Sequence, residues 1–225
     1  MAHSGLLEFF SNCNSASRIT HAISKEKTPI VLVGASGYAR TVYAASVYQR
    51  LKRPVVLVYS NSEDAVTSRR DLGDLIGHEC VLLFPAREIM PFETSDNQEA
   101  LWMRVSCLSK LLLDESRPFA VVMPATALSR KLMEKEQFLE GCFRLHVGSR
   151  HFPDALVRDL VRFGYSRVSS IERKGEVALR GGILDVFPPT ADNPYRIEFF
   201  DDEVDSIRCF ELASQVSTHS VDEAL

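Results

Sequence analysis

The segment VVLVYSNSEDAVTSRRDLGDLIGHECVLLF, residues 55–84, decides the fold of the first half of the chain. It begins with Val55 to Tyr59, a short apolar run rich in β-branched residues, which predicts a buried strand. Asn61 is a preferred N-cap for the helix that follows to about Ile76. Cys80 to Phe84 is a second apolar run, and two buried strands joined by a helix are typical of a parallel sheet.

The same alternation of strand and helix extends upstream of residue 55. Pro29-Ile-Val-Leu-Val33 is a short β-rich run that ends at Gly34, and it predicts another strand. The residues from Tyr38 to Leu51 have a helical period. Nearer the start of the chain, apolar residues recur at spacings of three and four from Leu6 to about His21, which predicts an amphipathic helix.

Downstream of residue 84 the sequence predicts one more helix and one more strand. Asp96 or Asn97 caps a helix that runs to about Leu113, and Phe119-Ala-Val-Val-Met123 is the strand. We therefore expect residues 1–125 to form an α/β domain with a mainly parallel sheet that helices cover on both faces.

Beyond residue 125 the pattern changes to short helices and alternating strands. Helices are expected at 128–140 and 153–163. We expect residues 126–212 to form a smaller α+β domain, in which helices pack against one face of an antiparallel sheet, and residues 213–225 to begin a continuing segment. Four runs separated by turn residues predict the strands of that sheet: Glu176–Arg180, Gly182–Phe187, Tyr195–Phe200 and Val204–Phe210.

Composition excludes several classes of protein. The chain has 225 residues, of which 45% are hydrophobic, and a formal net charge of -4, so it can bury a core but lacks a strong basic excess for duplex DNA. No apolar run approaches the roughly 20 residues that cross a bilayer. Because the five cysteines are widely spaced, we expect buried thiols in a reducing cytosol, with no disulfide framework and no metal site.

Charge separates within the second half of the chain. Residues 130–184 carry 11 basic and 7 acidic side chains, whereas residues 185–225 carry 2 basic and 10 acidic ones. Both a polar docking surface and an acidic solvated edge are consistent with this separation.

The turn Gly34-Ala-Ser-Gly37-Tyr-Ala39-Arg40-Thr41 stands where a phosphate-binding P-loop would stand, between an expected strand and a helix. A working loop needs GxxxxGK[ST], and here Ala39 replaces the second glycine and Arg40 replaces the lysine. Alanine adds a Cβ against the ligand, and a planar guanidinium does not substitute for a compact ammonium. We therefore expect no nucleotide cofactor at this degenerate P-loop, while anion binding at the helix N-terminus, Gly37 to Thr41, stays open.

No catalytic constellation is visible in the sequence. Leu111-Leu-Leu-Asp114-Glu115 has the form of a Walker B strand, but Trp102, Val105 and Leu108 continue one helical face into it. We therefore expect Asp114 to lie at the end of a helix. The chain has neither a GxSxG elbow nor an HExxH motif, so we expect no catalytic residue.

Two stretches resemble a known module. Arg180-Gly-Gly-Ile-Leu-Asp-Val-Phe-Pro-Pro-Thr190, together with the run from Tyr195 to Arg208, closely resembles the UvrB-homology module that UvrB shares with the bacterial transcription-repair coupling factors (Mfd). UvrB also has an intact P-loop and a long aromatic-rich hairpin, and this chain has neither. Over about residues 5–217 the chain is therefore more similar to the N-terminal region of the coupling factors.

The resemblance implies a non-catalytic adaptor in the bacterial cytoplasm. It implies that residues 126–212 recruit UvrA to stalled RNA polymerase in nucleotide excision repair, with Arg180, Arg196 and Phe200 as partner-binding residues. In that family the chain continues into an RNA polymerase-binding domain and a DNA translocase motor that uses ATP and Mg²⁺. The polymerase and DNA are then contacted by regions absent from this sequence, and those regions also contact this module within the chain.

The residues alone leave two interpretations of the strand at 195–200. In one, Arg196 and Phe200 anchor a protein interface, because arginine and aromatic residues are common anchors. In the other, Arg196 pairs with Glu198 or Asp185 and Phe200 lies under a loop. In either case period-two alternation puts two sets on opposite faces: Tyr195, Ile197 and Phe199 on one, and Arg196, Glu198 and Phe200 on the other.

Other functions remain as alternatives to a UvrA-binding module of a coupling factor. One is an ATP-dependent, UvrB-type protein that handles damaged DNA, which the degenerate P-loop disfavours. Another is a free-standing UvrA-binding adaptor. Direct DNA binding is disfavoured by the acidic balance of the chain.

Overall fold

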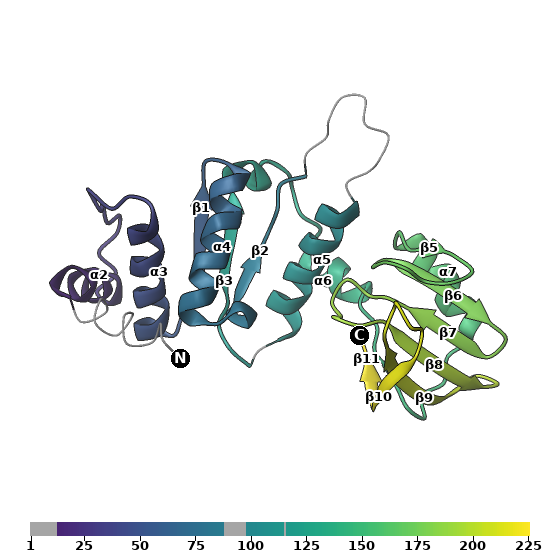
Figure 1. Ribbon diagram of the computed structural model, residues 1–225. Helices are drawn as coiled ribbons and strands as arrows, with labels where there is room; N and C mark the ends of the chain where they lie inside the picture. Colours follow the sequence, from purple (N-terminus) through teal and green to yellow (C-terminus); the bar gives the residue numbers. More distant parts are fainter. Residues whose placement is uncertain (1–12, 88–97, 115) are drawn as a thin grey trace. The chain divides into compact units, whose positions relative to one another are not determined.

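The computed structural model describes residues 13–87, 98–114 and 116–225. The chain divides into two compact units, Met1–Lys131 and Leu132–Leu225. The first unit contains a parallel sheet with helices, and the second contains a mixed, mostly antiparallel sheet (Figure 1). This confirms the expected fold class. Within the described residues, no helix is both long and apolar enough to span a membrane.

The first unit is built on three parallel strands in the order β1-β3-β2 (Figure 1). The strands are β1 (Val55–Tyr59), β2 (Val81–Leu83) and β3 (Ala120–Pro124). The helices are α2 (Asn14–Ser24), α3 (Tyr38–Leu51), α4 (Ser62–Ile76) and α5 (Gln98–Leu113), with 3₁₀ helices η1 (His78–Cys80) and η2 (Ala125–Ser129). Asn61 caps α4 as predicted, since its side-chain oxygen accepts a hydrogen bond from the Asp64 amide at 2.8 Å.

Two apolar clusters hold this sheet, one on each face. Alternation along β3 sends Ala120 and Val122 into a cluster with the buried residues of α3 and α4. Val121 and Met123 point the other way, into a cluster that includes Cys107 of α5. Because both faces of β3 are buried, its sequence is a continuous apolar run without polar positions.

The strand predicted at residues 29–33 does not form. These residues lie outside any strand, and Val31 and Val33 are 80% and 88% exposed. Residues 29–33 pair with none of the three strands of the sheet, and β-propensity alone does not order a segment without a paired neighbour.

The expected cover of helices on both faces of the sheet is also incomplete at β1. This strand lies at the edge of the sheet, and its side chains alternate between the apolar cluster and solvent. Val56 and Val58 are exposed, so helices cover only one face of β1.

One helix prediction was wrong, and parts of two others lie outside the described residues. The helix expected at 128–140 is instead η2 followed by the short α6 (Lys135–Glu140). No residue of α6 is buried, so no packed face extends it into a longer helix. The segment from Leu6 to residue 12 and the caps Asp96 and Asn97 lie outside the described residues.

The second unit is a six-stranded sheet in the order β10-β9-β8-β7-β6-β5, with a separate β11-β4 pair. Neighbouring strands are antiparallel except for β5 and β6. The elements are β4 (Leu145–His146), α7 (Pro153–Arg162), β5 (Ser166–Arg167), β6 (Glu176–Arg180), β7 (Ile183–Val186), β8 (Tyr195–Phe200), β9 (Glu203–Phe210), β10 (Ser217–Val221) and β11 (Glu223–Ala224). The four strands predicted from alternation are all present.

Helix α7 packs on one face of this sheet. Its buried Leu156, Val157 and Leu160 form one cluster with inward-facing residues of the central strands, such as Leu184 and Ile197. The sequence analysis did not anticipate β10, which pairs with β9 across a bulge. The middle of β10 is exposed and polar, so it lacks the alternating apolar pattern that marks the other strands.

We predict that two adjacent residues of β7 differ strongly in their importance for folding. Leu184→Ala should lower the free energy of unfolding of the second unit by about 2–5 kcal/mol, because Leu184 is fully buried in the α7 cluster. Ile183→Ala, on the opposite and exposed side of the strand, should stay within about 0.5 kcal/mol of the parent chain.

Hydrogen exchange of the β7 and β8 amides with added urea measures this difference. Tryptophan fluorescence does not, because the single tryptophan, Trp102, belongs to the first unit. Equal losses for the two variants would contradict the assignment of the two faces.

Candidate functional site

The P-loop-like turn, Gly34 to Thr41, leads into α3, and its last four residues form the first turn of that helix. Gly34 and Gly37 have φ angles of +84° and +54°, and Gly37 is the N-cap of α3 without a side-chain hydrogen bond. Thr41, whose hydroxyl would face Mg²⁺ in a working loop, is buried in the first turn of α3. The turn therefore retains the first motif glycine, Gly34, but neither the second glycine nor an accessible hydroxyl at Thr41.

Arg40 is engaged within the molecule. Its guanidinium carbon lies 5.3 Å from the centroid of the Tyr59 ring, at the carboxyl end of β1. The Tyr59 hydroxyl is in turn 2.6 Å from the Ser68 hydroxyl of α4. Arg40, which occupies the position of the P-loop lysine, therefore lies over the ring of Tyr59.

The Walker B-like run is helical, as expected. Residues up to Leu113 belong to α5, and Asp114 follows its end, where its amide donates to the carbonyl of Lys110. Hydrogen bonds from the Ser116 hydroxyl and amide lower the pKa of the Asp114 carboxyl. Asp114 is therefore a local turn acceptor, and Glu115 lies outside the described residues.

A buried carboxylate, Asp185 of β7, organises the face of the second sheet opposite α7. Asp185 is 1% exposed, and its two oxygens accept hydrogen bonds from two arginines. The Arg180 Nη2 donates to Oδ2 at 2.8 Å, while the Arg196 Nε donates to Oδ1 at 2.8 Å and its Nη2 to Oδ2 at 3.0 Å. The two predicted arginines therefore meet on one acid, which the sequence analysis offered only as a partner for Arg196.

Arg196 is largely enclosed. Its remaining terminal nitrogen donates to the carbonyl of Gln215 at 3.2 Å, and its guanidinium carbon lies 4.5 Å from the centroid of the Phe210 ring. Hydrogen bonding to Asp185 raises the pKa of Arg196 above its ordinary value. Only 18% of the side chain is exposed, compared with 55% for Arg180.

A second row of side chains runs beside this ion cluster. Ile183 pairs in register with both Arg180 and Glu198, so it stands between them on the same face. The Glu198 carboxylate accepts hydrogen bonds from Arg208 at 3.0 Å and from Ser206 at 3.1 Å. Arg196 therefore pairs with Asp185, and Glu198 pairs with Arg208 instead.

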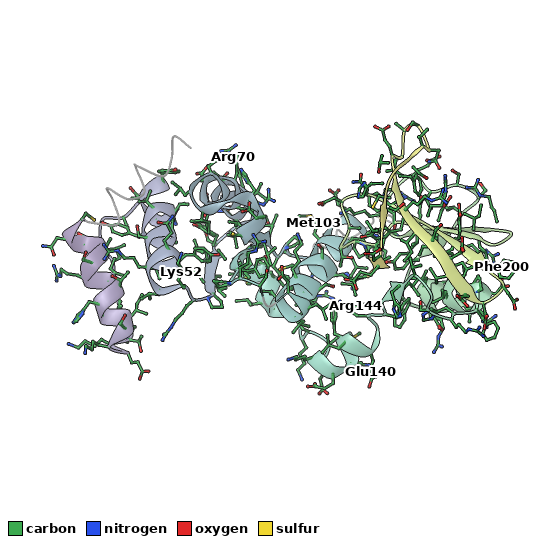
Figure 2. All side chains as sticks on the ribbon, turned by 90° about the horizontal axis from the view of Figure 1, so that it is seen from below. Lys52, Arg70, Met103, Glu140, Arg144 and Phe200 are labelled. Atoms are coloured by element: carbon green, nitrogen blue, oxygen red, sulfur yellow. The ribbon has the colours of Figure 1, made fainter. Side chains whose placement is uncertain are left out.

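Phe200 ends β8 and projects into solvent. Its side chain is 81% exposed, and Figure 2 shows Phe200 at the outer end of the sheet of the second unit. Alternation along β8 places it on the same side as Arg196 and Glu198, whereas Phe199 packs into the α7 cluster. The interpretation that Phe200 lies under a loop is wrong.

Gly182 explains why the start of β7 can approach β8 closely. A Cβ on Gly182 would lie 2.8 Å from the carbonyl oxygen of Phe199, and that carbonyl belongs to the residue before Phe200. The Phe199 amide donates to the Gly182 carbonyl at 2.8 Å. The glycine pair after Arg180 is therefore structural and lies directly beside the exposed aromatic residue.

We call the resulting surface the Asp185 face and define it by Arg180, Ile183, Asp185, Arg196 and Phe200. It offers an exposed guanidinium, an exposed aliphatic side chain and an exposed aromatic ring on a rigid sheet. These groups suit protein recognition, since arginine and aromatic side chains often anchor interfaces. The described residues contain no group of histidines, cysteines and acids that could hold a metal ion.

The cysteines fit the expectation of buried thiols only in part. All five are free, and Cys80, Cys107 and Cys209 are buried, but Cys13 and Cys142 are half-buried. Burial raises the pKa of the Cys107 thiol to about 12, which keeps it protonated and unreactive at neutral pH.

Comparison with known proteins places this face in a recognised domain. Residues 143–225 match the model of the UvrB interaction domain. The chain is 34% identical over 192 residues to the transcription-repair-coupling factor of Bacillus subtilis (strain 168), covering 85% of this chain and 16% of the relative. The corresponding protein of Myxococcus xanthus is 34% identical over 197 residues, covering 84% of this chain and 16% of the relative. The chain thus spans about 16% of the length of these relatives.

We predict that this chain does not bind MgATP with micromolar affinity. Ala39 replaces the glycine of a working loop, the Arg40 guanidinium lies over the Tyr59 ring, and Thr41 is buried. Isothermal titration calorimetry with MgATP at up to millimolar concentration should show no saturable heat, and the double variant Ala39→Gly, Arg40→Lys serves as the comparison. Saturable binding by the parent chain that Thr41→Ala abolishes would contradict the prediction.

Proposed function

Because the chain is homologous over most of its length to the N-terminal region of transcription-repair-coupling factors, we propose that it is a UvrA-recruiting module of that kind. In this proposal the second unit docks UvrA through the Asp185 face and so brings repair proteins to stalled RNA polymerase. The module itself does no catalysis. ATP, Mg²⁺, DNA and the polymerase are contacted by the regions that coupling factors contain beyond the part matched here.

One observation carries the proposal. Phe200 is an 81% exposed phenylalanine at the end of a strand, and Arg180, held by a buried acid, lies on the same face of that sheet. A solvent-exposed aromatic ring has no role in the packing of its own unit. The match to the UvrB interaction domain covers both residues, which supports UvrA as the partner.

The geometry of the first unit disfavours the alternative of an ATP-dependent, UvrB-type protein. Such a protein needs a lysine or an equivalent point charge at the phosphates and a hydroxyl open to Mg²⁺. Here the corresponding Arg40 lies on Tyr59 and Thr41 is buried. The proposed role therefore places recognition in the second unit and assigns no chemistry to the first.

We predict that Arg180→Ala and Phe200→Ala each weaken binding to purified UvrA by about 30-fold, which corresponds to about 2 kcal/mol, the range of interface hot spots. Ile183→Ala should weaken it by about 5-fold, because a smaller apolar area is lost. Biolayer interferometry with immobilised UvrA measures the affinities, and hydrogen exchange of β8 verifies that each variant is folded.

Arg162→Ala is the matched control. Arg162 is 82% exposed and ends α7, which packs on the opposite face of the sheet, so its removal should leave the affinity unchanged. Unchanged affinity for both Arg180→Ala and Phe200→Ala in folded chains would show that the docking surface lies elsewhere.

A further inference from the structure

The burial of Asp185 requires a reason. An ionised carboxylate with 1% exposure loses its hydration, and arginine partners compensate this loss only when the geometry is good. Here three charge-assisted hydrogen bonds of 2.8 to 3.0 Å supply that compensation. A packed apolar residue of similar volume is often at least as stabilising as a buried ion pair, so stability alone does not account for an acid at this position.

The two arginines use Asp185 differently. Arg196 directs its Nε and one terminal nitrogen to the carboxylate and the other terminal nitrogen to the Gln215 carbonyl, and its flat face lies on Phe210. Its donors are thus turned into the protein. Arg180 makes one hydrogen bond to the acid and leaves more than half of its side chain in solvent.

One carboxylate oxygen of Asp185 connects the two arginines. Oδ2 of Asp185 accepts from both Arg196 and Arg180, so the orientation that Arg196 imposes on the carboxylate also determines where Arg180 is held. The strand register places Asp185 directly between Ala178 of β6 and Arg196 of β8, on the rigid centre of the sheet.

We propose that Asp185 and Arg196 are positioning residues, which hold the Arg180 guanidinium at the surface, and that Arg180 and Phe200 are the residues that touch the partner. This inference rests on the proposed UvrA docking function. Arg180 then presents its remaining N–H groups to a carboxylate on the partner, because a guanidinium fork fits a carboxylate in two parallel hydrogen bonds. The loss of Arg196 weakens binding through the disorder of Arg180 and not through a lost contact of its own.

A double-mutant cycle separates positioning from direct contact, because only residues that act through one another show non-additive effects. The affinity for UvrA is measured for the parent chain, Asp185→Asn, Arg180→Ala and the double variant. We expect Asp185→Asn to weaken binding about 10-fold in the parent chain and less than 2-fold in the Arg180→Ala background. Asp185→Asn retains the shape of the side chain and removes its charge.

Glu198→Gln is the matched control. Glu198 is a carboxylate on the same face and also binds an arginine, Arg208, but it makes no hydrogen bond to Arg180. Its effect should be the same in the parent chain and in the Arg180→Ala background. If Asp185→Asn fails to fold, Arg196→Lys takes its place in the cycle, because lysine retains the charge but not the fork that orients the carboxylate.

The outcomes distinguish the two claims. A loss of affinity for Asp185→Asn, or for Arg196→Lys, that persists undiminished in the Arg180→Ala background overturns the positioning role and leaves the docking surface intact. If Arg180→Ala and Phe200→Ala both bind UvrA like the parent chain, the proposed docking function fails, and the positioning role fails with it. A loss that disappears with Arg180 supports both.

Discussion

The buried carboxylate of Asp185 is the constraint on which the surface of the second unit depends. It joins β7 to β6 and β8 through side chains, and through Arg196 it also fastens the turn at Gln215 to the sheet. Because a charge in this position must be satisfied by several donors at once, the strands around it have little freedom to shift register. The Asp185 face thereby has a buried ionic centre, although its outer groups remain in solvent.

The two units differ in how they use the side chains that the sequence analysis singled out. In the first unit, the exposed Arg40 lies over the Tyr59 ring and Thr41 is buried, and no strand forms at residues 29–33, before the turn at Gly34. The second places its unusual residues on the outside, where Phe200 serves no packing purpose. The side chains that the two units leave in solvent therefore differ in kind, and among the described residues only the second unit combines an exposed phenylalanine with an arginine held by a buried acid.

Much of this arrangement could be predicted from the sequence. The helix from Tyr38 to Leu51 and the strands β6 and β8 lie where periodicity placed them, because their apolar spacing coincides with burial. The prediction of a strand around Val31 was wrong, because β-propensity favours a strand but does not specify that the segment pairs with one. The sharing of Asp185 by Arg180 and Arg196 depends on strand register, which alternation within single strands does not specify.

The edge position of β1 has a consequence for the behaviour of the chain in solution. An edge strand offers backbone donors and acceptors to any extended segment, and proteins usually protect such edges with charge, proline or a bulge. On β1 the outward residues are the exposed Val56 and Val58, and the apolar run at residues 29–33 is exposed as well. An exposed apolar edge of this kind favours self-association, so Val56→Lys is the substitution that would protect the edge while leaving the residues of the Asp185 face unchanged.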